Sequence, residues 1–255
     1  MKVGKLIGAS LGPGDPQLIT RRAWNALHSD ARWMWPVRKK SGDSYALSIA
    51  LAAGLTPAED GIPQVFPMTH DREILARYWV QAAEVVLKTV NSGRDLVFLV
   101  EGDASTYSTF GYLARTVRAL QPDVVVDTIP GVSAYHAASA LLGEPLADTD
   151  DTVAILPAAY GIAYLDSIVH QFDTLVLLKV KPLLDELIDW LAQHDLLQHA
   201  RFVEKAGSSL EKVVTDVASL RGAKVNYLSL LLVRNPGRQR GAVQKGCRKK
   251  NEQLT

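Results

Sequence analysis

The chain has a single cysteine, Cys247, and no apolar run near the roughly 20 residues that a membrane-spanning helix needs. One cysteine excludes a disulfide framework within the chain and favours a reducing compartment. The first residues, MKVGKLIGAS, also lack the long apolar core of a secretory signal. We therefore expect a cytoplasmic protein without a membrane-spanning segment.

The chain also lacks an excess of charge of either sign, because its 28 Lys and Arg residues nearly balance its 27 Asp and Glu residues and leave a formal net charge of +1. Such a balance gives no indication of nucleic-acid or membrane-surface binding. The hydrophobic content of 47% and the charged content of 22% are typical of a globular protein with a sizeable core. The histidines are scattered without the spacing of metal ligands, so no metal site is expected; they are His28, His70, His136, His170, His194 and His199.

Short apolar runs rich in β-branched residues alternate with helical patterns along the chain. One helical stripe runs from Ile74 to Val90 and closes near Gly93, and another follows Pro182. This alternation predicts an α/β protein with a mainly parallel sheet in at least part of it. The predicted strands are Leu96–Val100, Val124–Ile129, Thr152–Leu156, Thr174–Val180 and Tyr227–Val233.

A polar, acidic and turn-rich connection at residues 143–151 separates two series of strands. We predict an N-terminal α/β domain at residues 1–135 and a C-terminal α/β domain at residues 136–236. Residues 237–255 are strongly basic and have no apolar periodicity, which indicates a flexible, solvated tail. A weak contact with an anion is the alternative interpretation of this tail.

The first strand-to-helix turn reads LGPGDPQLIT and has the outline of a nucleotide-binding loop. A phosphate-binding P-loop needs a lysine and a hydroxyl residue after its last glycine, but Asp15 and Pro16 follow Gly14. The glycines also lack the spacing of a dinucleotide-binding turn. Asp15 and Pro16 instead predict the N-cap and the first residue of a helix that continues through Leu27.

Two further predicted strands run into loops of similar chemistry. The first loop reads EGDASTY at residues 101–107, and the second reads PGVSA at residues 130–134. In α/β proteins ligands bind beyond the carboxyl ends of the strands. Glycines in such loops allow close approach of the backbone, while Asp, Ser and Thr make directed hydrogen bonds. The loops therefore predict one ligand site at this edge of the sheet.

GPGDP, EGD and PGVSA occur in the order that is typical of the tetrapyrrole methylase family, which this chain resembles over roughly residues 3–234. Members of that family transfer a methyl group from S-adenosylmethionine. KKSGDSYALSIA at residues 39–50 and FPMTHD at residues 66–71 are most similar to the branch that converts precorrin-2 to precorrin-3A by methylating C20 in cobalamin biosynthesis. The resemblance implies two α/β domains with the cofactor cleft between them, in a homodimer.

The resemblance also implies which residues contact S-adenosylmethionine. Leu178 stands where many relatives have methionine, and Ala104 stands where the family usually has proline, which predicts a less rigid loop. The implied cofactor contacts are Pro13, Gly102, Asp103, Thr106, Ser133, Ala134, Leu178, Ala206 and Gly207.

Methyl transfer from a sulfonium needs orientation and a dry pocket more than it needs catalytic side chains. A proton must leave the methylated carbon, and Tyr107, Glu101 and His136 are the candidate acceptors. Because precorrin-2 carries many carboxylates, cations should line its site. The candidates for substrate binding are Arg38, Lys39, Lys40, Arg21 and Arg115.

Three alternatives remain open at this stage. The substrate can be cobalt-factor II instead of metal-free precorrin-2, or the chain can be another methylase of the same family. A non-catalytic protein that binds a tetrapyrrole or the cofactor is the third, and Ala104 is the one residue that favours it.

Overall fold

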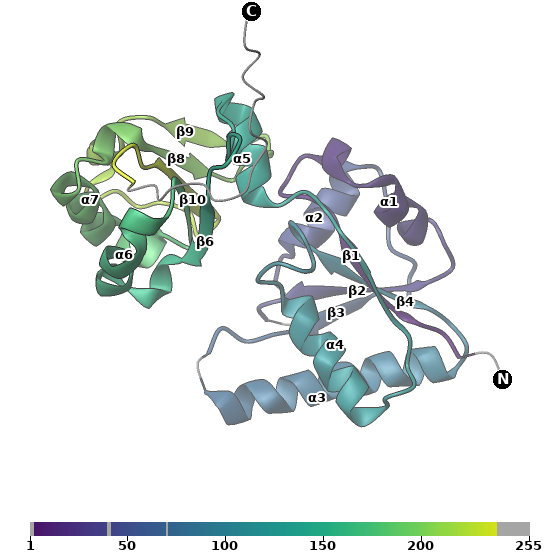
Figure 1. Ribbon diagram of the computed structural model, residues 1–255. Coiled ribbons are helices and arrows are strands. Elements are labelled where there is room, and N and C mark those ends of the chain that lie inside the picture. Colours follow the sequence, from purple (N-terminus) through teal and green to yellow (C-terminus); the bar gives the residue numbers. More distant parts are fainter. Residues whose placement is uncertain (1–2, 40–41, 70, 239–255) are drawn as a thin grey trace, which may run out of the picture. The chain divides into compact units, whose positions relative to one another are not determined.

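The computed structural model of the chain describes residues 3–39, 42–69 and 71–238 (Figure 1). These residues form two compact units. The first comprises the chain up to Glu144 together with Val203–Val213, and the second comprises Pro145–Phe202 and the chain from Val214 onward. The predicted boundary after residue 135 falls within helix α5, whose residues belong to the first unit. Lys40 and residues 239–255 of the predicted tail lie outside the described residues.

The first unit contains a five-stranded sheet in the order β3-β2-β4-β1-β5, and the neighbouring strands pair in parallel. Its strands are β1 (Leu6–Ser10), β2 (Arg32–Val37), β3 (Ile62–Val65), β4 (Leu96–Val100) and β5 (Val126–Ile129). Its helices are α1 (Arg21–Leu27), α2 (Tyr45–Ala52), α3 (Arg72–Asn91), α4 (Thr109–Leu120) and α5 (Ala134–Leu142). The parallel sheet confirms the prediction and brings the carboxyl ends of β1, β4 and β5 to one edge.

Strand β4 is buried on both faces, which explains its continuous apolar sequence. Because successive side chains point to opposite faces, Leu96, Phe98 and Val100 pack with residues of α3 and α4. Val97 and Leu99 pack with residues of α1 and α2 on the other face. Helices therefore cover both faces of the sheet (Figure 1). The loops at the ends of the strands remain available for binding a ligand.

The other sheet is mixed, with its strands in the order β6-β7-β10-β8-β9. Most of it belongs to the second unit, whereas the end of β8 and most of β9 lie within Val203–Val213 of the first. Strand β7 pairs in parallel with β6 and antiparallel with β10. The elements are β6 (Val153–Pro157), α6 (Ile162–Ile168), β7 (Thr174–Leu178), α7 (Leu184–Gln193), β8 (Ala200–Glu204), β9 (Lys212–Val214) and β10 (Ser229–Arg234). Two α/β units confirm the predicted fold class.

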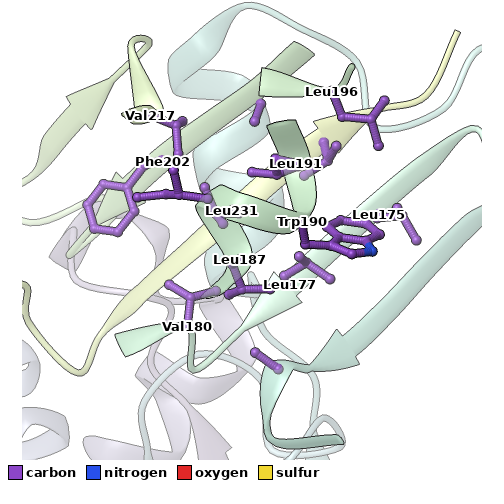
Figure 2. Close-up of a cluster of buried hydrophobic side chains, with 14 of the residues drawn as sticks. Leu175, Leu177, Val180, Leu187, Trp190, Leu191, Leu196, Phe202, Val217 and Leu231 are labelled. Carbon is purple, nitrogen blue, oxygen red and sulfur yellow. The ribbon is translucent and has the colours of Figure 1, made fainter. Parts of the chain in front are cut away.

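The core of the second unit forms between α7 and the sheet (Figure 2). Leu187 and Leu191 are buried on one face of α7, at the helical spacing that the sequence predicted, and Trp190 is buried beside them. They belong to the same cluster as Leu177 of β7 and Leu231 of β10. Each such side chain contributes about 1.5–3 kcal/mol when it is fully buried.

The predicted helix from Pro16 to Leu27 is wrong as one continuous element. The Asp15 carboxylate accepts the Gln17 N–H and caps only a short 3-10 helix, Pro16–Leu18. The chain is then extended, and the Thr20 hydroxyl accepts the N–H of the third residue of α1 at 3.2 Å. A second N-cap therefore starts a separate helix.

Helix α3 begins and ends close to its predicted limits. The Asp71 carboxylate accepts the N–H groups of Glu73 and Ile74, and Ser92 and Gly93 end the helix. The φ of Gly93 is 91°, a conformation that favours glycine. Within the described ranges, none of the helices has both the length and the apolar character that crossing a bilayer requires.

Candidate functional site

Ser10 connects the carboxyl ends of β1 and β5 with the loop that follows β4. It ends β1, and it is completely buried. Its hydroxyl donates to the carbonyl of Ile129 at 2.6 Å and accepts the N–H of Ala104 at 2.8 Å. Because proline has no N–H, alanine at position 104 makes a bond that the usual family residue cannot make. Ser10 was not among the residues predicted from the sequence, although a hydroxyl residue that ends an apolar strand was a usable signal.

Asp103 makes a further connection, between the loop after β4 and the loop after β5. One carboxylate oxygen accepts the N–H of Gly131 at 3.0 Å. The other accepts the Ser105 N–H at 3.2 Å, the Thr106 hydroxyl at 2.9 Å and the Ser105 hydroxyl. Burial acts to raise the pKa of Asp103, but the hydrogen bonds outweigh it and hold the pKa below its ordinary value. The side chain therefore organises the loops as an ionised carboxylate.

Glycine is required where these loops meet. A Cβ atom on Gly131 would lie 2.4 Å from the Cβ of Ser10 and 2.9 Å from the carbonyl oxygen of Gly102. Gly102 itself has a φ of 69°. Its N–H donates to the Gly12 carbonyl at 2.7 Å and its carbonyl accepts the Gly12 N–H at 3.2 Å. The glycines of the three motifs thus serve close backbone contacts.

The structure also brings together the predicted cofactor residues of the first loop and of the segment after β8. A Cβ atom on Gly207 would lie 3.2 Å from the Cγ of Pro13, and Gly207 has a φ of 75°. Its N–H donates to the Glu211 carboxylate at 3.0 Å, and the preceding Ala206 is buried. These residues come from distant parts of the sequence and lie side by side.

Several hydrogen-bond donors in this region have no acceptor among the described residues. Among them are the N–H of Asp103, the hydroxyl of Ser133 and the N–H of Ala134. Ser133 occupies the N-cap of α5, yet its side chain makes no capping bond and is buried. Hydrogen-bond donors that have no protein acceptor and lie next to close backbone contacts are suited to binding a polar ligand.

The candidate proton acceptors lie on or beside the same loops. Tyr107 has a φ of 50°, which is rare for a residue other than glycine, and its side chain is exposed. His136 is exposed on α5 beside the ring of Tyr135, with ring centroids 4.6 Å apart. Desolvation by surrounding protein atoms raises the pKa of Glu101, and Arg38 acts to lower it. Because Glu101 also has an exposed face, water moderates both effects.

The candidate substrate cations are distributed over the first unit. Arg38 and Lys39 follow β2 directly and are exposed, and Lys40 lies outside the described residues. Arg21 is the exposed first residue of α1. The exposed guanidinium of Arg115 lies 4.6 Å from the centroid of the Tyr112 ring on α4.

Leu178, the remaining predicted cofactor contact, is the last residue of β7 in the second unit. It is half-buried and pairs with Leu230. No group of three or more histidine, cysteine, aspartate or glutamate side chains suited to a metal ion gathers within residues 3–39, 42–69 and 71–238.

Curated proteins similar to this chain carry related names. A probable cobalt-precorrin-2 C(20)-methyltransferase of Methanocaldococcus jannaschii is 30% identical over 91% of this chain and 96% of its own length. The precorrin-2 C(20)-methyltransferase of a Sinorhizobium species is 29% identical over 91% and 95%. The cobalt-precorrin-2 C(20)-methyltransferase of Salmonella typhimurium is 32% identical over 80% and 84%.

Solved structures share the fold at lower sequence identity. The cobalt precorrin-4 methyltransferase CbiF superposes with a TM-score of 0.65 at 20% identity, over 90% of this chain and 94% of that one. The uroporphyrin-III C-methyl transferase of Thermus thermophilus, complexed with S-adenosyl homocysteine, gives 0.61 at 21% identity, over 91% and 98%. The profile of the tetrapyrrole (corrin/porphyrin) methylases matches residues 5–220. With this match across both α/β units, the chain belongs to the tetrapyrrole methylase family.

Proposed function

We propose that the protein transfers a methyl group from S-adenosylmethionine to C20 of precorrin-2, giving precorrin-3A in cobalamin biosynthesis. The observation that carries this proposal is the alignment with C20-methyltransferases over 91% of the chain at 29–30% identity. The solved methyltransferases that share the fold act on other tetrapyrroles and are 20–21% identical, so they support the fold alone.

S-adenosylmethionine supplies a methyl group that its sulfonium already activates. Its carboxylate, ribose hydroxyls and adenine nitrogens are acceptors that match donors without a protein acceptor, such as those at Asp103, Ser133 and Ala134. This match supports the proposed cofactor contacts. The full proposed set is Pro13, Gly102, Asp103, Thr106, Ser133, Ala134, Leu178, Ala206 and Gly207.

The protein's part in the reaction is mainly to orient the reactants and to exclude water. Glu101, Tyr107 and His136 are the proposed acceptors of the proton that leaves C20. Glu101 suits this role best, because desolvation raises its pKa above the ordinary value of a carboxyl, which makes its carboxylate a stronger base. Changing Glu101 to Gln should then lower kcat while the affinity for S-adenosylhomocysteine stays unchanged.

Cations would bind the acetate and propionate groups of the substrate. The proposed residues are Arg38, Lys39, Lys40, Arg21 and Arg115. Arg38 and Lys39 are the strongest candidates, because they are exposed directly after β2, at the carboxyl edge of the parallel sheet. Arg38→Ala should raise the KM for precorrin-2 and leave the KM for S-adenosylmethionine unchanged.

The experiment that tests the function is incubation with methyl-labelled S-adenosylmethionine and either precorrin-2 or cobalt-factor II, followed by NMR of the product. Label at C20 supports the proposal, and the faster of the two substrates identifies the metal state. Label at another carbon would assign the chain to another branch of the family. Cofactor binding without any labelled product would favour a non-catalytic binding protein.

We also propose a cytoplasmic homodimer that does not bind nucleic acid. The single cysteine supports a reducing compartment, and the net charge of +1 offers no electrostatic basis for nucleic-acid binding. Exposed apolar side chains on and near α3 and α4, namely Met68, Ile74, Val80 and Tyr112, support self-association. Light scattering during size-exclusion chromatography should give twice the chain mass of 27.8 kDa.

A further inference from the structure

Tyr45 touches two loops that are far apart in the sequence. It is the first residue of α2, and its hydroxyl donates to the carbonyl of Pro13 at 3.1 Å. The side chain of Ser208 lies next to the same hydroxyl, because both would contact a Cβ atom placed on Gly14. Burial raises the pKa of Tyr45, and hydrogen bonding by the Ser208 side chain acts to lower it. One phenol oxygen thus connects the GPGDP loop with the segment of residues 205–211.

Packing around Gly14 makes this connection close. A Cβ atom at Gly14 would lie 2.7 Å from the hydroxyl oxygen of Tyr45, 2.9 Å from the Cβ of Ser208 and 3.0 Å from its backbone nitrogen. Glycine at this position therefore leaves room for both side chains to lie over the loop. The GPGDP motif serves this contact in addition to the predicted cofactor contact of Pro13.

The GPGDP loop, α2 and the segment of residues 205–211 also line a cavity of about 590 Å³. Its walls include Tyr45 and Ile49 of α2, Asp15 of the GPGDP loop, and Ser208 and Leu210 of the segment after β8. Because a cavity borders residues 205–211, the segment has fewer packing partners on that side, and contacts such as the one with Tyr45 contribute more to its position. Burial raises the pKa of Tyr45, so its hydroxyl remains a donor at neutral pH.

We propose that Tyr45 is a positioning residue: it holds residues 205–211 against the GPGDP loop and so shapes the S-adenosylmethionine site. Ala206 and Gly207, both proposed cofactor contacts, directly precede Ser208, and Gly207 packs on Pro13. Displacing Ser208 would move both contacts. The positioning of the segment stands on geometry alone, whereas its effect on the cofactor rests on the proposed function.

The first test measures hydrogen exchange in the ligand-free, full-length protein. In Tyr45→Phe, the amides of Gly207, Ser208 and Glu211, which bond within the segment, should exchange about fivefold faster, since one net hydrogen bond is lost. Tyr164→Phe is the matched control, because it removes an exposed hydroxyl from α6. Exchange in Tyr45→Phe equal to that of the control would overturn the proposal.

The second test measures S-adenosylhomocysteine affinity by calorimetry. Tyr45→Phe and Ser208→Ala should each bind about fivefold more weakly, and the double variant should lose less affinity than the two effects combined, because both remove the contact between Tyr45 and Ser208. Ser208→Ala also removes the acceptor of the Leu210 N–H. Ser208→Ala also tests the proposal if Tyr45→Phe folds poorly. Faster exchange with unchanged affinity would overturn the effect on the cofactor. A wild-type protein that binds no S-adenosylhomocysteine would overturn the proposed function, while the exchange result still decides the role of Tyr45.

Discussion

The carboxylate of Asp103 accepts the N–H of Gly131 at 3.0 Å, and this bond joins the loop after β4 to the loop that opens α5. The same carboxylate accepts hydrogen bonds from Ser105 and Thr106 within its own loop. Asp103 is buried, whereas Ser105 is exposed and Thr106 and Gly131 are half-buried. The geometry of both predicted cofactor loops therefore depends on one side chain.

Replacing Asp103 by Asn should damage both stability and cofactor binding. Asparagine offers one oxygen and one NH2 group, so at least one of the present donors would face another donor. We expect the free energy of unfolding to fall by about 1–3 kcal/mol and S-adenosylhomocysteine to bind about tenfold more weakly. Urea unfolding and calorimetry measure the two effects.

The control for this variant is Asp127→Asn. Asp127 forms an ion pair with Arg22 at 2.7 Å, and the Arg22 side chain is largely exposed. Such pairs contribute about 1 kcal/mol at most, so neither the stability nor the affinity should change much. Equal affinities of Asp103→Asn and Asp127→Asn would contradict the role of Asp103.

The lowered pKa of Asp103 predicts a pH dependence of stability. A carboxyl whose pKa is lower in the folded than in the unfolded chain contributes full stability above the unfolded pKa of about 4. This contribution declines as the pH falls through the folded value. The stability difference between the wild type and Asp103→Asn should therefore shrink between pH 5 and pH 3. Urea unfolding across this range checks it; a difference that stays constant would contradict the shift.

Much of the fold could be predicted because its signals are local. Leu96–Val100 is a buried strand of unbroken apolar residues, and its predicted limits agree with β4. The end of α3 was predictable from Gly93. The break before α1 was not, since Thr20 is a good N-cap only when the preceding residues are extended, and the apolar spacing continues across it.

The motifs of the candidate site could be predicted, but the hydrogen bonds that connect its loops could not. The EGD and PGVSA loops point to one edge of a parallel sheet, but no local pattern pairs Asp103 with Gly131 or Ser10 with Ala104. The contact of Gly207 with Pro13 likewise joins residues almost 200 positions apart. Such pairings depend on strand order, which the sequence pattern leaves open.

Changing Ser10 to Ala should destabilise the edge of the sheet. The buried carbonyl of Ile129 and the N–H of Ala104 would each lose their bond to this hydroxyl. We expect a loss of about 2 kcal/mol in unfolding free energy, because buried groups without partners are costly. Thermal and urea unfolding measure it. A change below about 0.5 kcal/mol would show that other groups replace the hydroxyl.

Ser133→Ala should weaken cofactor binding while it changes the free energy of unfolding little. The Ser133 hydroxyl is at the N-cap of α5 but makes no capping bond, so its removal should cost less than the usual 1 kcal/mol or so of a lost cap. We expect S-adenosylhomocysteine to bind about fivefold to tenfold more weakly, since one hydrogen bond to the ligand is lost.

Thr20→Ala is the opposite case: the Thr20 hydroxyl caps α1, so the free energy of unfolding should fall by about 1 kcal/mol while the affinity for S-adenosylhomocysteine is unchanged. If Ser133→Ala instead lowers stability and leaves affinity intact, the hydroxyl has a structural role and the proposed cofactor contact at α5 is wrong.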